Sequence, residues 1–158
     1  MTIQSALQIL GAIGVISSIL FTGLQIRRNT RALRAAALHN LSQSFTAMWT
    51  PLATSAEVMD LTLRSGDDFD SLTRNEKARV RFHMMLFMRT YENAYFHYKI
   101  GILKLQDWVA VLGDLEGNLS RPSSPAIWAL VRSRTGAEFA AVVDDIIARQ
   151  DQEAMATS

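Results

Sequence analysis

The chain has 158 residues, of which 49% are hydrophobic and 20% charged, enough for one domain with a modest core. It contains no cysteine, which excludes disulfides, thiolate metal sites and cysteine nucleophiles. The formal net charge of +1 conceals an uneven distribution. Residues 1–26 carry no charged side chain and no histidine, four arginines follow, and the first acidic residue is Glu57.

The uncharged stretch predicts a transmembrane helix, with residues 1–26 as an anchor. Its 21 apolar-rich residues from Ala6 to Ile26 would extend roughly 31 Å as a helix, about the thickness of a bilayer's hydrocarbon core. A cleaved signal peptide would carry its positive charge before the apolar run rather than after it. A buried helix of a soluble bundle would normally show polar residues on one face. Both alternatives fit the sequence less well than a membrane span.

Four arginines form a collar directly after this stretch: Arg27, Arg28, Arg31 and Arg34. Positive residues that flank a span stay on the cytoplasmic side of a membrane. We therefore expect a single-pass protein with its N-terminus outside and its C-terminal domain in the cytoplasm. The collar can attract anionic lipid headgroups. An arginine cluster can also bind nucleic acid, but a collar beside a span does not require that explanation, and we expect no nucleic-acid partner.

Small residues recur on one face of the predicted span, at Gly11, Gly14, Ser18 and Thr22. Within a membrane such a stripe lets two helices approach closely, and its hydroxyl groups can bond across the interface. The stripe predicts a packing face for a second copy or another membrane protein. The alternative is that glycine and serine are simply common in spans.

The remainder of the chain predicts helices only, so the expected fold is all-α: one transmembrane helix and a small cytoplasmic bundle of about five helices. The predicted segments are a connecting segment at 27–50, the bundle at 51–150 and a frayed tail at 151–158. Local signals place the first two helices at Ala32–Trp49, which ends before Pro51, and at Ser55–Arg64, which Gly66 closes. A Thr73–Glu76 capping box opens the next helix, Thr73–Ile100, and Gly101 ends it. Then follow Leu105–Leu119, a short helix capped by Ser124 that runs through Trp128, and a last helix opened by a second capping box, Thr135–Glu138.

The predicted helix over residues 73–100 is the central one, because apolar residues cover most of its circumference. It also carries a polar cluster: Arg89, Glu92, Asn93 and His97. Arg89 and Glu92 are three residues apart, and Asn93 and His97 four apart, so the members of each pair can touch. A buried carboxylate beside an arginine and an imidazole can form an acid–base site or line a ligand pocket. More often such groups form a hydrogen-bonded network that fixes how helices pack.

The sequence predicts neither a metal site nor a cofactor. His83 and His97 share one helix but are about 21 Å apart, and His39 has no carboxylate at helical spacing. Asp67, Asp68 and Asp70 lack the further ligands of a calcium loop and predict a solvated turn. No phosphate-binding loop, serine elbow or zinc helix motif is present, so an enzymatic activity is not expected.

Two segments resemble a family of small bacterial membrane proteins that has no assigned function. The run from Phe21 to Arg34 is similar to that family's span followed by a Gln-Ile-Arg-x-Asn-Thr collar, and Glu92-Asn93-Ala94-Tyr95 is similar to its central segment. The resemblance implies a helical domain anchored in the bacterial inner membrane, and it marks Glu92, Asn93 and Tyr95 as positions of interest. It implies no activity.

These observations together favour a non-catalytic interaction module, self-associating or an accessory subunit of a larger membrane complex. Membrane lipid and another membrane protein, or a second copy, are the expected partners. The alternative is a ligand-sensing or enzymatic helical domain that uses the polar cluster.

Overall fold

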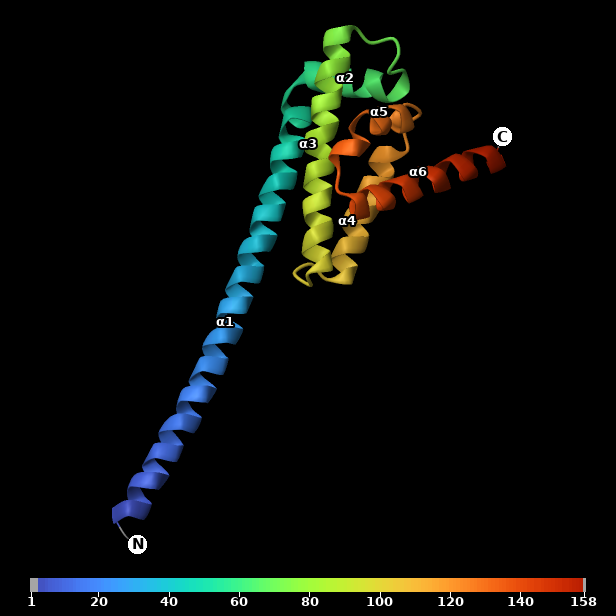
Figure 1. Ribbon diagram of the computed structural model, residues 1–158. Helices are drawn as coiled ribbons and strands as arrows, with labels where there is room; N and C mark the ends of the chain where they lie inside the picture. Colours follow the sequence, from blue (N-terminus) through green and yellow to red (C-terminus); the bar gives the residue numbers. More distant parts are fainter. Residues whose placement is uncertain (1–2, 158) are drawn as a thin grey trace. The chain divides into compact units, whose positions relative to one another are not determined.

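The computed structural model describes residues 3–157, and side chains from Gly14 to Ala156. Over this range every regular element is a helix and there is no strand, as the sequence predicts. The elements, labelled in Figure 1, are α1 (Ile3–Thr54), α2 (Ala56–Asp67), α3 (Arg74–Lys99), α4 (Leu105–Leu119), α5 (Ser124–Val131), a 3₁₀ turn η1 (Arg132–Arg134) and α6 (Ala137–Thr157).

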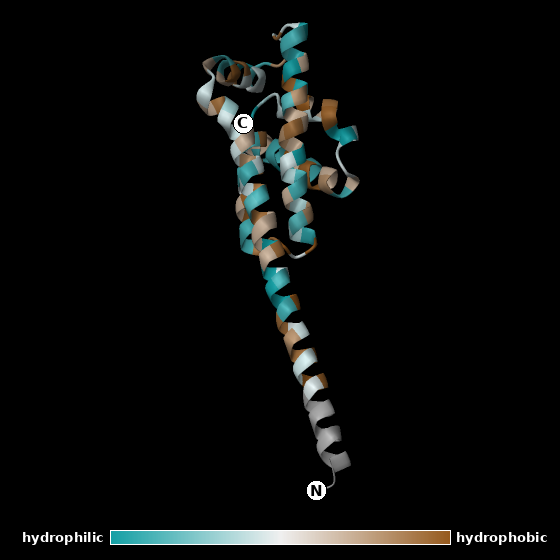
Figure 2. Ribbon diagram, turned by 90° about the vertical axis from the view of Figure 1, so that its left-hand side faces the viewer, coloured by the Kyte–Doolittle hydropathy of each residue, from teal (hydrophilic) through white to brown (hydrophobic). Residues whose placement is uncertain are grey.

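The chain divides into two compact units, Met1–Leu38 and His39–Ser158. The first unit is helical from Ile3 onward, and the large apolar side chains described between Val15 and Leu33 are all more than half exposed. Residues 6–13 of the predicted span lie outside the described side chains. Within the described residues, no helix combines the length and apolar character needed to cross a membrane. In Figure 2 the arginine collar follows the apolar turns as a hydrophilic segment.

The second unit is built around α3, which packs against α2, α4 and α5. Tyr91, at its centre, is fully buried, and its ring lies 4.7 Å from that of Phe87 and 5.2 Å from that of Phe45, centroid to centroid. Spaced at three and four residues along α3, the buried and half-buried side chains form the predicted apolar stripe: Val80, Met84, Phe87, Tyr91, Tyr95 and Tyr98. The opposite side of α3 is not covered, and Phe82 and Leu86 are exposed there.

The second compact unit begins at His39, within the predicted connecting segment 27–50. Leu41 and Met48 belong to its main core, so the C-terminal part of α1 is one of the bundle's helices. The predicted helix end before Pro51 is wrong, because α1 continues to Thr54. Pro51 lacks an amide donor, but its carbonyl still accepts a bond from the Ser55 amide at 3.0 Å, so the last turn of α1 is hydrogen-bonded.

The two ends of α3 are as predicted. Thr73 is the N-cap, and its side chain accepts from the Glu76 amide while the Glu76 carboxylate accepts from the Thr73 amide, which completes the capping box. Beyond Lys99 the chain turns at Gly101, whose φ of 73° is readily adopted only by glycine.

Other helix boundaries differ from the predictions. Gly66 lies inside α2 rather than closing it, and the N-cap of α5 is Ser123 rather than Ser124. The second capping box does not form, because α6 begins only at Ala137, and the Glu138 carboxylate instead pairs with Lys99 on α3 at 3.1 Å. The predicted tail is helical as far as it is described, because α6 continues to Thr157 through residues that mostly favour helix.

Candidate functional site

The polar cluster of α3 is organised around one buried carboxylate. Glu92 is only 4% exposed, and each of its oxygens has a partner. Oε2 accepts from Arg89 Nη1 at 2.6 Å, one helical turn earlier, and Oε1 accepts from the backbone amide of Gly136 at 2.7 Å. Burial of an ionised carboxylate is tolerated only when such bonds replace its hydration.

Arg89 extends this contact to the segment that leads into α6. Its Nη2 atom donates to the carbonyl oxygen of Arg134 at 3.2 Å, so the guanidinium bridges Glu92 and the backbone of η1. Together Arg89 and Glu92 hold Arg134 and Gly136 against α3. Such contacts are typical of a hydrogen-bonded packing network, one of the alternatives that the sequence allows, and both oxygens of Glu92 take part in them.

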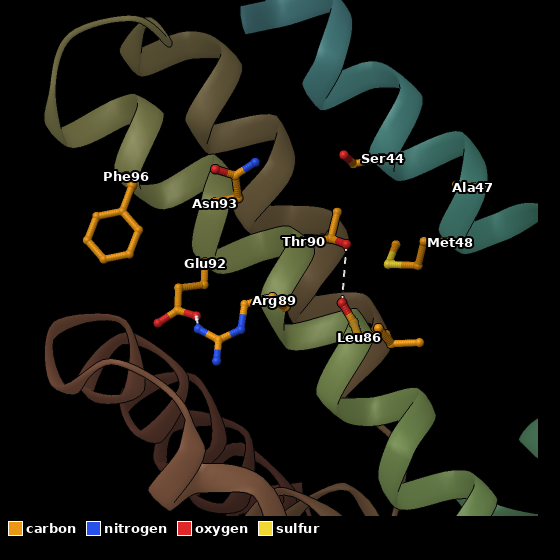
Figure 3. A pocket seen from close by; sticks show the side chains of 9 residues that line it. All are labelled: Ser44, Ala47, Met48, Leu86, Arg89, Thr90, Glu92, Asn93 and Phe96. Carbon is orange, nitrogen blue, oxygen red and sulfur yellow. Dashed lines mark hydrogen bonds and ion pairs between the residues drawn. The ribbon is translucent and has the colours of Figure 1, made fainter.

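A cavity of about 550 Å³ adjoins the network between α1 and α3 (Figure 3). Arg89, Glu92 and Asn93 all line it, and Asn93 is exposed there. The other residues that line the cavity come from two helices: Ser44, Ala47 and Met48 from α1, and Leu86, Thr90 and Phe96 from α3. The structure thus brings three of the four cluster residues to one hollow, as a ligand pocket requires.

His97 does not belong to this group. It lies in the last turn of α3 and is not among the residues that line the cavity. Its Nδ1 atom is buried and has no hydrogen-bond partner among the described residues, while its carbonyl oxygen accepts from the amides of Ile102 and Leu103. Among the described residues no hydrogen bond joins the side chains of His97 and Asn93, and the His97 carbonyl closes the turn after α3.

A second polar contact on α3 was not predicted. The hydroxyl group of Tyr91 donates to the carboxylate of Asp114 on α4, and the Asn118 side chain also donates to Asp114. Burial, followed by the neighbouring Asp114 carboxylate, raises the pKa of the Tyr91 hydroxyl well above its usual value. The contact joins α3 to α4 and keeps Tyr91 protonated, so it too is structural.

Within the described part of the chain, no group of three or more potential ligands is close enough to hold a metal ion. His83 is half-buried on α3, and burial lowers its pKa. His83 instead lines a second cavity, of about 650 Å³, on the α2 side of α3. Sequence reasoning missed this cavity, because its wall is assembled from segments far apart along the chain.

The predicted membrane-contacting residues are exposed where they are described, except for Arg34. No neighbouring atom lies within 4 Å of an ideal Cβ on Gly14, and Ser18 and Thr22 are exposed, whereas Gly11 lies among the residues whose side chains are not described. Arg27, Arg28 and Arg31 of the collar are exposed as well, and Arg34 is half-buried.

Comparison with known proteins identified no relative: no protein family, no curated protein and no solved structure matches this sequence. The resemblance to a family of bacterial membrane proteins therefore remains a prediction.

Proposed function

We propose that this protein is a membrane-anchored, non-catalytic interaction module that associates with itself or serves as an accessory subunit of a membrane complex. The supporting observation is an uncharged helical segment, described from Gly14 to Ile26, whose large apolar side chains are all exposed. Exposure of such a continuous apolar surface to water is unfavourable, whereas lipid accommodates it. The arginine collar that follows the segment favours a cytoplasmic location for the bundle.

The polar network supports the non-catalytic part of the proposal. Both oxygens of Glu92 are occupied by bonds that fix the entry to α6, and Tyr91 and Asp114 are bound to each other. A general base needs an oxygen or nitrogen that can reach a substrate proton. Glu92, Tyr91 and Asp114 each make a hydrogen bond that holds helices together.

Fractionation and mild-detergent purification test the proposal. We expect the tagged protein to remain with membranes after an alkaline carbonate wash and to purify as a complex of defined mass. The mass distinguishes self-association from association with a different subunit. A chain that stays in solution without detergent would contradict the anchor, and a monomer without any partner would contradict the interaction module.

The small-residue stripe can be tested in the same preparation. The double variant Gly14→Leu/Ser18→Leu should dissociate the complex, because leucine prevents the close approach that glycine and serine permit. The control, Val15→Leu/Ile19→Leu, changes residues outside the stripe and should leave the complex intact. If both variants associate like the parent, the stripe is not the packing face.

A second candidate function, a ligand-sensing domain, is favoured by the 550 Å³ cavity beside Asn93. In this case a small molecule should be retained by the purified parent in native mass spectrometry and lost in Asn93→Leu. Asn75→Leu, an exposed position near the start of α3 that does not line the cavity, is the matched control. Equal retention by both variants would exclude this site.

A further inference from the structure

The second cavity, on the α2 side of α3, has the size and lining of a site for an apolar ligand. Its volume of about 650 Å³ lies within the range of roughly 300–1,000 Å³ that small-molecule sites occupy. Its wall combines residues of α1, α2, α3, α4 and α5 with the turn before α5. Apolar side chains predominate in it, including Trp49, Leu61 and Ile127.

Large apolar side chains also form the mouth of this cavity. Phe82 is 57% exposed and Leu86 69%, and both line the cavity from α3. Met59 and Leu63 line it from α2 and are exposed as well. A ligand that covered these four side chains would remove their apolar surface from water, at about 25 cal/mol per Å². The mouth therefore favours a hydrocarbon over a polar ligand.

The charged residues of the lining are all basic. Arg79 and Arg121 contribute guanidinium groups, and no carboxylate lines the cavity. Each arginine pairs with an acid of α2: Arg79 Nη1 lies 2.7 Å from Glu57, and Arg121 Nη1 lies 2.8 Å from Asp67. Those acids are ten residues apart, about 15 Å along the helix, so the two arginines mark opposite ends of α2.

Of the two arginines, Arg79 is better placed to bind a ligand. An ideal Cβ on Gly66 would lie 2.7 Å from Arg121 Cδ, which shows that the Arg121 side chain is packed tightly on α2. Arg79 lies one turn before Phe82 and His83 on α3, beside the mouth. A guanidinium has five N–H donors, and an arginine–carboxylate pair can share them with a second anion.

We propose that this cavity binds a monoacyl amphiphile with an anionic head, such as a long-chain fatty acid. The hydrocarbon chain lies between α2 and α3, where it covers the apolar wall and mouth, and the head accepts hydrogen bonds from Arg79. The imidazole of His83, one turn after Arg79 on α3, adds a further N–H donor beside the mouth. The proposal depends on neither the membrane anchor nor self-association.

Quenching of tryptophan fluorescence tests the proposal, because Trp49 lines the cavity whereas Trp108 and Trp128 are buried in the main core. The full chain is used in phosphatidylcholine vesicles if it fractionates with membranes, and in buffer if it does not. The probe is a long-chain fatty acid brominated at mid-chain, since bromine quenches only at close range. We expect saturable quenching in the parent and its loss in Trp49→Phe.

Two variants and their matched controls locate the chain and the head. Phe82→Asp should raise the apparent Kd of the fatty acid by at least about tenfold, because it places a charge at the apolar mouth. The control Val109→Asp changes an exposed apolar residue of α4 that does not line the cavity, and it should bind like the parent. Arg79→Gln should weaken binding about tenfold. Arg149→Gln, which also removes an exposed ion pair, should not.

Three outcomes would overturn the proposal. The first is equal quenching in the parent and in Phe82→Asp. The second is equally tight binding of the fatty acid and of its uncharged methyl ester, which would remove the role of Arg79. The third is quenching of Trp49 by brominated phosphatidylcholine without fatty acid, which would identify the occupant as a diacyl lipid of the bilayer.

Discussion

The Oε1 atom of Glu92 occupies the space that a side chain at Gly136 would need. It lies 2.7 Å from the Gly136 nitrogen, and an ideal Cβ on that residue would lie 2.7 Å from the same oxygen. Two residues separated by 44 positions therefore constrain each other: the carboxylate binds the amide, and a side chain at position 136 would require the carboxylate to move.

Gly136→Ala should destabilise the bundle. The new methyl group displaces Glu92 Oε1, and loss of a hydrogen bond to a buried charged group costs about 1.5–3 kcal/mol. Denaturant unfolding, followed by near-UV circular dichroism, measures the change. Gly113→Ala is the control: nothing lies within 4 Å of an ideal Cβ there, so alanine should stabilise α4 by about 0.5–1 kcal/mol. Equal effects at both positions would contradict the proposed contact.

Tyr91→Phe should lower stability by about 1.5–3 kcal/mol while leaving the packing of the ring intact, because it removes only the hydroxyl that donates to Asp114. The denaturation midpoint should fall without a change in slope. Tyr98→Phe is the control: its ring stacks on Trp108, and the free energy of unfolding should change by no more than about 0.5 kcal/mol. A Tyr91→Phe variant as stable as the parent would show that the hydroxyl–carboxylate bond contributes nothing.

Glu76 should make the bundle sensitive to acid. Hydrogen bonds from Arg64 and then from Thr73 lower its pKa from 4.5 to about 2. Because the pKa of Glu76 is lower in the folded state, its ionised carboxylate stabilises the folded bundle fully above pH 4.5. This contribution to the free energy of unfolding is lost as the pH falls toward about 2. Glu76→Gln should therefore flatten the stability profile over that window. Arg64→Gln, which removes the largest cause of the shift, should move the loss to higher pH. An unchanged profile in both variants would refute this assignment.

Orientation in the membrane should follow the collar. Replacement of Arg27, Arg28, Arg31 and Arg34 by glutamine, with two arginines added before Ala6, should move a C-terminal reporter from the cytoplasmic to the external side. The same four positions changed to lysine keep the charge and should keep the orientation. A reporter that stays cytoplasmic in every variant would contradict orientation by the collar.

Local signals explain which parts of the fold were predictable. The Thr73–Glu76 capping box and the positive φ of Gly101 act within a few residues, so the sequence is enough to place both ends of α3. The Thr135–Glu138 pattern is equally local, yet Glu138 pairs with Lys99 on another helix. Tertiary contact overrides the local preference there.

The candidate site was predictable only in part. Arg89 and Glu92 pair at the spacing that a helix imposes, but no feature of the sequence identifies Gly136 as the third member. His97 follows Asn93 by one turn and was grouped with it in the polar cluster, but only Asn93 lines the cavity. The cavity against α2 depends on how five helices converge, and no local pattern encodes that.

The central position of α3 has a consequence for synthesis on the ribosome. Its buried face is covered partly by α4 and α5, which are translated after it, and the anchoring partner of Glu92 is residue 136. Until residue 136 has left the ribosome, Phe87 and Tyr91 lack many of the side chains that bury them. The nascent chain then exposes an apolar helix to proteases and chaperones. A chain that terminates prematurely before α4 would keep that surface and be a substrate for degradation rather than a shorter working domain.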